Sequence, residues 1–183
     1  MRILFITGEY PPMRGGVGDY TAHLARPLAA RNHRVVVLTA TGAAGADTPG
    51  VAVMPRIDHW GIGAWRQIAH VARDFDLLHI QYQAAAFGMG VAPQLMPWML
   101  RHWTPRPVVT TFHDLRVPYL FPKAGPLRES SVRFMARASS GVIATNEEDA
   151  AMLEAWGVRT LWQVAIGANL PIDMPRTDPA TWR

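Results

Sequence analysis

The stretch ILFITGEYPPMRGGVGDYTAHLARPLAAR, residues 3–31, decides the fold because it joins an apolar run, a glycine-rich turn and a helical segment. The run from Ile3 to Thr7 is typical of a short strand buried on both faces of a parallel sheet. Helical spacing of apolar residues follows from about Gly18 to Arg31. Between them, Gly15 and Gly16 would let backbone amides approach an anion at the start of the helix. The same glycines can also serve only to shape a tight turn.

The alternation of short apolar runs with longer helical segments continues along the chain. It is typical of βαβ units around a parallel sheet. The link between the second and third runs is too short for a helix. We predict an α/β fold, a three-layer Rossmann-like domain with a mostly parallel sheet of about seven strands flanked by helices. The expected strands cover residues 3–7, 35–39, 51–54, 77–81, 108–112, 142–145 and 160–164, and the expected helices cover residues 18–31, 61–73, 91–103, 126–139 and 147–156.

Length and composition limit the class of protein. The chain has 183 residues, of which 49% are hydrophobic, enough for one sizeable core and too few for two ordinary domains. It has no cysteine, which excludes disulfides, and its first residues lack the long apolar stretch of a signal peptide, so we expect a cytoplasmic protein. The net charge of +4 comes from scattered arginines and the single Lys123, so nucleic acid is not an expected partner. The histidines show no paired-ligand spacing, and we expect no metal.

A dinucleotide-binding fingerprint is the first alternative for the glycine-rich turn. Thr21 stands where the third glycine of that fingerprint belongs. The second expected strand ends in Thr39, Ala40 and Thr41, without the acidic residue that would bind a ribose. A nicotinamide cofactor is therefore not expected.

The segment GEYPPMRGGVGDYTAHLARPLAARNHRVVVLT, residues 8–39, resembles the opening of the group 1, or family 4, retaining glycosyltransferases. Further matches follow in order and cover nearly the whole chain. They are DLLH at residues 76–79, TTFHDL at 110–115, ATNEEDAAMLEAWGV at 144–158 and VAIGANLP at 164–171.

The resemblance implies a GT-B enzyme, in which two Rossmann-like domains face each other across a cleft. The acceptor lies mainly on the first domain and the nucleotide sugar mainly on the second. Residues 1–171 would be the N-terminal, acceptor-side domain, and residues 172–183 a linker or the start of the crossover to a C-terminal donor-binding domain. The donor-binding signature of that second domain is absent, so we expect this chain alone to be inactive.

The resemblance also implies a site. In it, Gly15 and Gly16 would contact the donor diphosphate, and His113 would line the transferred sugar as the catalytic residue. No cofactor or metal is implied. The acceptor, a sugar, lipid or polyol, would be flanked by residues at the carboxyl ends of strands: Glu9, Tyr10, Gln81, Tyr82 and Asp114.

Other interpretations stay open at this point. His113 and Asp114 could form a local structural pair that caps a loop. The chain could be half of a nucleotide-sugar epimerase, or a stand-alone module that binds a ligand without catalysis. The expected enzyme is a transferase of hexosyltransferase type that moves a sugar from a nucleotide sugar with retention.

Tryptophans beside cations raise the possibility of a peripheral contact with the inner face of the membrane. Trp60 and Trp65 lie near Arg56, and Trp98 and Trp103 lie near Arg101. Aromatic rings prefer the lipid headgroup level, and basic groups favour anionic lipid. The favoured interpretation of the first group is a helix that packs on the sheet, with Ile62, Trp65, Ile68, Ala69 and Ala72 at helical spacing.

Overall fold

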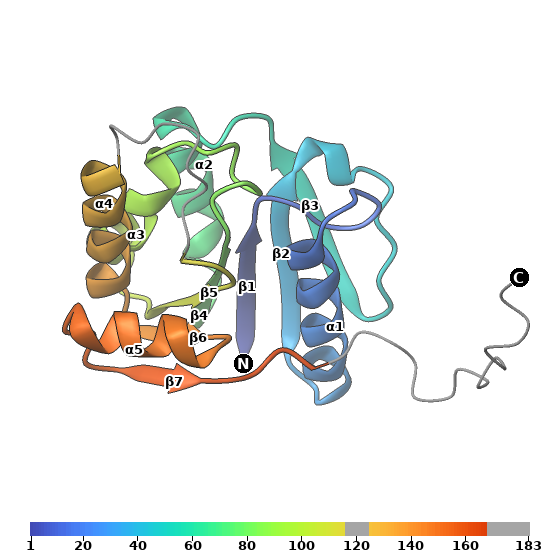
Figure 1. Ribbon diagram of the computed structural model, residues 1–183. Helices are drawn as coiled ribbons and strands as arrows, with labels where there is room; N and C mark the ends of the chain where they lie inside the picture. The colour runs from blue at the N-terminus through green and yellow to red at the C-terminus, as the bar shows by residue number, and fades with distance from the viewer. Residues whose placement is uncertain (116–124, 168–183) are drawn as a thin grey trace, which may run out of the picture.

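The computed structural model describes residues 1–115 and 125–167. Within these residues the chain forms one seven-stranded sheet, and every pairing in it is parallel (Figure 1). The strand order is β3-β2-β1-β4-β5-β6-β7. The strands are β1 (Arg2–Thr7), β2 (Arg34–Ala40), β3 (Val51–Ile57), β4 (Leu77–Tyr82), β5 (Val108–Phe112), β6 (Gly141–Ala144) and β7 (Leu161–Gln163).

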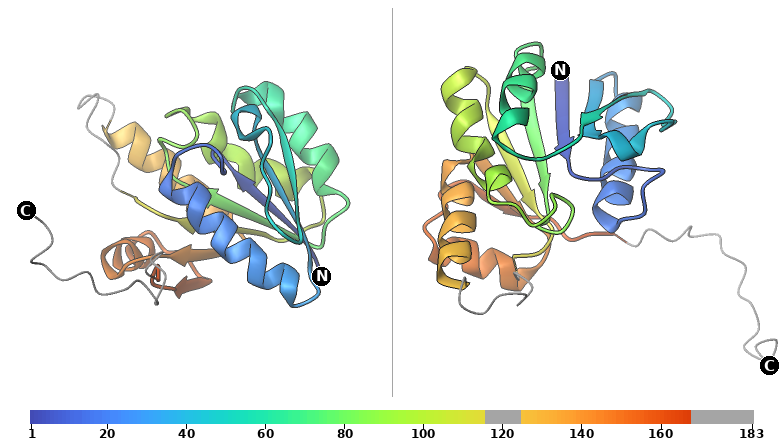
Figure 2. Two further views of the ribbon diagram at one scale, coloured as in Figure 1. Left: turned by 90° about the vertical axis from the view of Figure 1, so that its right-hand side faces the viewer. Right: turned by 90° about the horizontal axis from the view of Figure 1, so that it is seen from above.

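Helices cover both faces of this sheet, which gives the three predicted layers (Figure 2). Alternate residues of β1 enter two separate apolar clusters, because successive side chains of a strand point to opposite faces. Ile3 and Phe5 pack with Ala22 of α1, whereas Leu4 and Ile6 belong to the larger cluster under α2 and α3. The helices are α1 (Gly16–Ala30), α2 (Ile62–Ala72), α3 (Met96–Trp103), α4 (Gly125–Ala138) and α5 (Glu147–Ala155).

The predicted α/β Rossmann-like fold is confirmed, with one helix that differs. Residues 91–103 do not form a single helix, because a 3-10 helix η2 (Ala92–Leu95) precedes α3. Pro97 in the first turn of α3 has no N–H to continue a helical ladder from the preceding turn. The short link after β2 holds only one 3-10 turn, η1 (Thr41–Ala43). The predicted domain end at residue 171 and the linker 172–183 lie outside the described residues.

Helix α5 begins as its sequence predicts. The Asn146 side chain accepts a hydrogen bond of 2.7 Å from the backbone N–H of Asp149, and three acidic residues follow in the first turn. A side-chain acceptor satisfies one of the free amides at a helix start, and carboxylates are stabilised there by the helix dipole. The local sequence alone thus fixes this boundary.

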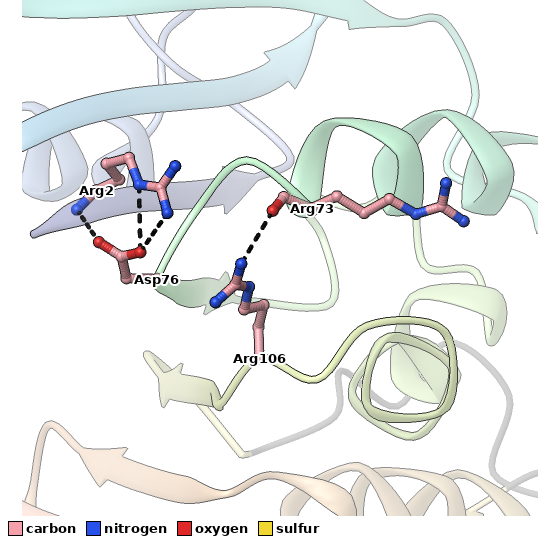
Figure 3. Close-up of polar contacts among 4 residues, drawn as sticks. All are labelled: Arg2, Arg73, Asp76 and Arg106. Carbon is pink, nitrogen blue, oxygen red and sulfur yellow. Dashed lines mark hydrogen bonds and ion pairs between the residues drawn. The ribbon is translucent and has the colours of Figure 1, made fainter.

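An ion pair fastens β1 to the start of β4 at the amino edge of the sheet (Figure 3). The Arg2 backbone N–H and guanidinium both donate to the Asp76 carboxylate, at 2.8 and 2.7 Å. These hydrogen bonds hold the pKa of Asp76 at about 2. Nearby, Arg106 donates to the Arg73 carbonyl. The amino ends of β1 and β4 are therefore held together. The candidate site lies at the opposite edge of the sheet, at the carboxyl ends of these strands.

Candidate functional site

The strand order reverses between β1 and β4, so the chain leaves their carboxyl ends in opposite directions. In open α/β sheets, ligands bind in the crevice at this topological switch point. The segment Gly8–Gly15 follows β1, Gln81 lies near the end of β4, and His113 comes directly after β5. The structure therefore brings the predicted glycine turn and the predicted catalytic histidine to one edge of the sheet.

His113 is held by three contacts, two from β4 and one from α1. Its Nε2 lies 2.8 Å from Oε1 of Gln81, and its backbone N–H donates to the carbonyl of Tyr82 at 3.0 Å. The edge of the Tyr20 ring meets its imidazole with centroids 4.7 Å apart. Burial lowers the pKa of His113 to about 4, so the imidazole is neutral at pH 7. The side chain stays partly exposed and can reach a ligand.

Tyr20 is a member of this site that the sequence analysis missed. It lies on α1, one turn beyond the glycines, and is partly buried against His113. Burial raises the pKa of its hydroxyl, so the phenol is neutral at pH 7. An aromatic residue just after a glycine-rich turn is the signal that could have indicated it, because the first turn of such a helix lies at the switch point.

The glycine turn already holds an anion of this chain. One carboxylate oxygen of Glu9, Oε1, accepts hydrogen bonds from the backbone N–H groups of Val17 and Gly18, at 3.1 and 3.3 Å. A side chain on Gly15 would collide with that carboxylate. Gly16 is exposed, with open space around it. The amides at the start of α1 thus bind a carboxylate of the chain itself, and the predicted contact of Gly15 and Gly16 with a donor diphosphate stays a prediction.

Replacing Glu9 with alanine is expected to free the amides of Val17 and Gly18. The free energy of unfolding should fall by about 1 kcal/mol, as for loss of a helix cap. Pyrophosphate should bind the vacated turn about tenfold more tightly, because a like charge has been removed. Urea denaturation and a phosphorus NMR titration measure the two effects.

Asp19→Ala is the matched control, since Asp19 is exposed in the same first turn and accepts neither of these bonds. Unchanged pyrophosphate affinity in Glu9→Ala would contradict an anion site at this turn.

Two predicted acceptor residues have side chains inside the core. The Tyr10 ring is fully buried, and its hydroxyl donates to Thr48 at 2.9 Å. The Tyr82 ring is 1% exposed, contacts Phe112, and its hydroxyl accepts from Gln94. In this structure neither ring presents a surface to a ligand, which differs from the prediction, because their apolar rings fill the space under the loops.

The two remaining predicted acceptor residues, Gln81 and Asp114, differ in their exposure. Gln81 is fully buried and reaches the site through His113. Asp114 is partly exposed directly after His113.

A second histidine, His79, lies buried behind the site. Its Nε2 is 2.8 Å from the Thr111 hydroxyl, and its ring stacks on Phe5 with centroids 5.0 Å apart. Burial first, and the neighbouring His113 second, lower its pKa to about 3. His79 therefore folds as the neutral imidazole.

This burial predicts a loss of stability in acid. Between pH 6.5 and about 3, the unfolded chain binds a proton at His79 that the folded chain does not. The contribution of His79 to the unfolding free energy is therefore full above pH 6.5 and decreases as the pH is lowered through this range. His79→Gln should reduce the slope of unfolding free energy against pH by up to about 1.4 kcal/mol per pH unit. Chemical denaturation across this range measures it, with the exposed His59→Gln as control. An unchanged slope in His79→Gln would contradict the assignment.

The strand order defines a Rossmann-like domain, and these groups form its candidate ligand site at the switch point. The model of the family described as "Glycosyl transferase 4-like domain" matches residues 15–166. The chain belongs to this glycosyltransferase family, which confirms the predicted resemblance to the group 1 enzymes. No curated protein sequence matches the chain.

Solved structures of GT-B glycosyltransferases share the fold. Sucrose-phosphate synthase from Thermosynechococcus elongatus superposes with a TM-score of 0.69 at 17% identity, over 92% of this chain and 49% of that one. HepE from Anabaena, solved in complex with UDP, gives a TM-score of 0.57 at 20% identity, over 92% and 44%. This chain therefore spans about half the length of each.

Proposed function

We propose that this chain is the acceptor-binding half of a retaining glycosyltransferase that moves a sugar from a nucleotide sugar to a sugar, lipid or polyol. The observation that carries the proposal is His113, a neutral and partly exposed imidazole beside an anion-binding glycine turn at the switch point. Membership of the family supports the transferase, and the UDP bound to HepE supports a nucleotide donor. The hexosyltransferase type and retention follow from the resemblance.

The proposed roles come from the family resemblance, and the positions of the groups support them. The amides at the start of α1 would face the donor diphosphate, whose negative charge grows as its bond to the sugar breaks. His113 would bind the transferred sugar at the point where its bond to the acceptor oxygen forms. Glu9 occupies two of the amides, so it would have to leave them for the diphosphate to bind there. We propose no metal or cofactor in this domain.

The chain covers about half of sucrose-phosphate synthase and of HepE, which supports a second domain that holds most of the donor. The test is a transfer assay with the full-length gene product, a panel of nucleotide sugars and candidate acceptors. We expect donor turnover that depends on acceptor, and none from residues 1–183 alone. Conversion of nucleotide sugar without acceptor would indicate an epimerase, and ligand binding without either reaction would indicate a binding module.

A peripheral contact with the inner face of an anionic membrane is part of the proposal. Trp98 and Trp103 are exposed on α3, at 44% and 45%. Trp98 also lines a hollow of about 450 Å³ with Phe134 and Arg133 of α4. Trp60 and Trp65 instead pack against the core. No helix in the described parts of the chain has the length and hydrophobicity needed to cross a bilayer. Co-sedimentation with anionic but not neutral liposomes would support the contact, and equal binding would contradict it.

A further inference from the structure

Gln81 is placed by the sheet to act on His113. In the β4–β5 pairing, Gln81 lies opposite Thr111, and His113 follows Thr111 by two residues. Side chains two apart on a strand share a face, so the Gln81 amide and the imidazole meet on one side of the sheet. The 2.8 Å contact joins Oε1 of Gln81 to Nε2 of His113.

With Oε1 of Gln81 facing the ring, this contact assigns the ring proton to one nitrogen. A carboxamide oxygen can only accept a hydrogen bond, so Nε2 must donate. A neutral imidazole carries one proton, which leaves Nδ1 as a lone-pair acceptor.

The other half of the amide is left without a partner. Nε2 of Gln81 is buried and makes no hydrogen bond to any described residue. Burying an unsatisfied N–H₂ group destabilises a fold, and an apolar side chain of similar shape would avoid that cost. The Gln81 amide thus uses one acceptor and leaves two donors unused. We attribute its presence in the core to the hydrogen bond that its oxygen accepts from His113.

We propose that Gln81 is a positioning residue that holds His113 in the Nε2–H tautomer and presents Nδ1 as a hydrogen-bond acceptor to a hydroxyl of the bound sugar. The role toward sugar rests on the proposed function, whereas the tautomer does not. Besides Gln81, the imidazole interacts with Tyr20 from α1 and His79 from β4, and Asp114 follows it in the chain. Burial keeps the ring neutral, so Nδ1 favours a donor such as a hydroxyl over a phosphate or carboxylate oxygen.

Long-range proton–nitrogen NMR of the labelled chain at pH 7 tests the tautomer directly, because a protonated and an unprotonated ring nitrogen resonate far apart. We expect the signature of Nε2–H for His113 in the wild type. Gln81→Met has a similar shape and no acceptor, and it should lower the tautomer ratio about five- to tenfold, which corresponds to one hydrogen bond. Gln81→Glu keeps the acceptor and should retain Nε2–H, with the pKa of His113 raised by the new charge.

The same variants separate positioning from packing. Gln81→Met should unfold at the same temperature as the wild type or higher, since it removes a buried unsatisfied group. A wild-type spectrum with the proton on Nδ1, or an unchanged ratio in Gln81→Met, overturns the proposal. None of these readouts needs sugar transfer, so a failed transfer assay would reject the proposed function and leave the tautomer assignment standing.

Discussion

Gly8→Ala is expected to destabilise the chain by about 3 kcal/mol or more, because the added side chain has no room. An added Cβ at this position would overlap the backbone carbonyl of Ala86 and lie 2.9 Å from the backbone nitrogen of Phe87. These are main-chain atoms of the segment after β4, which cannot rotate away as a flexible side chain can. Overpacking of a rigid site costs about 1–3 kcal/mol, and forced movement of two loops should reach the top of that range or exceed it. Thermal and urea unfolding measure the change.

The close approach of Gly8 to Ala86 also determines how the segment after β4 packs. It draws the segment after β4 over the end of β1, where Phe87 packs on Trp60 and Tyr82. Gly16→Ala is the matched control, because Gly16 has open space around it and begins a helix. That variant should be neutral or slightly stabilising, since alanine is favoured over glycine in helices. If Gly8→Ala were as stable as Gly16→Ala, the two loops would not be packed as described.

His113→Ala is expected to reduce sugar transfer by the full-length protein about 100- to 1,000-fold, the range for loss of one preorganised polar group at a reacting centre. The effect should fall on kcat, because the imidazole would act where the bond to the acceptor forms. Stability should fall by about 1–3 kcal/mol, since the buried Gln81 amide loses its hydrogen-bond partner, so the assay is run below the unfolding temperature of the variant. Steady-state kinetics with the best donor and acceptor measure the effect.

His59→Ala is the control for His113→Ala, because His59 is exposed before α2 and far along the chain from the glycine turn. It should transfer sugar at the wild-type rate. Transfer that survives His113→Ala would favour the alternative that the sequence left open, in which His113 and Asp114 form a local structural pair. Loss of acceptor-independent donor hydrolysis alone would place His113 on the donor side only.

The sequence predicted much of this fold because its signals are local. The apolar runs from Ile3 and Val35 are long enough to be buried on both faces, and the Asn146 cap fixes the start of α5. The helix predicted over residues 91–103 failed for a reason that is also local, since Pro97 forces a new start. His113 was found through the family motif, and no periodicity or spacing would have singled it out.

By itself the sequence determined the α/β class, the strands, the glycine turn and the family, because each depends on residues close together in the chain. Only the tertiary structure decided where each candidate site residue lies and what it contacts. Parallel pairing of β4 with β5 brings Gln81 to His113 across 32 positions, and α1 brings Tyr20 to the same ring. The return of Glu9 onto Val17 likewise turns an expected acceptor residue into the anion that fills the turn. Burial and hydrogen bonding depend on neighbours distant in sequence, so composition and spacing cannot supply them.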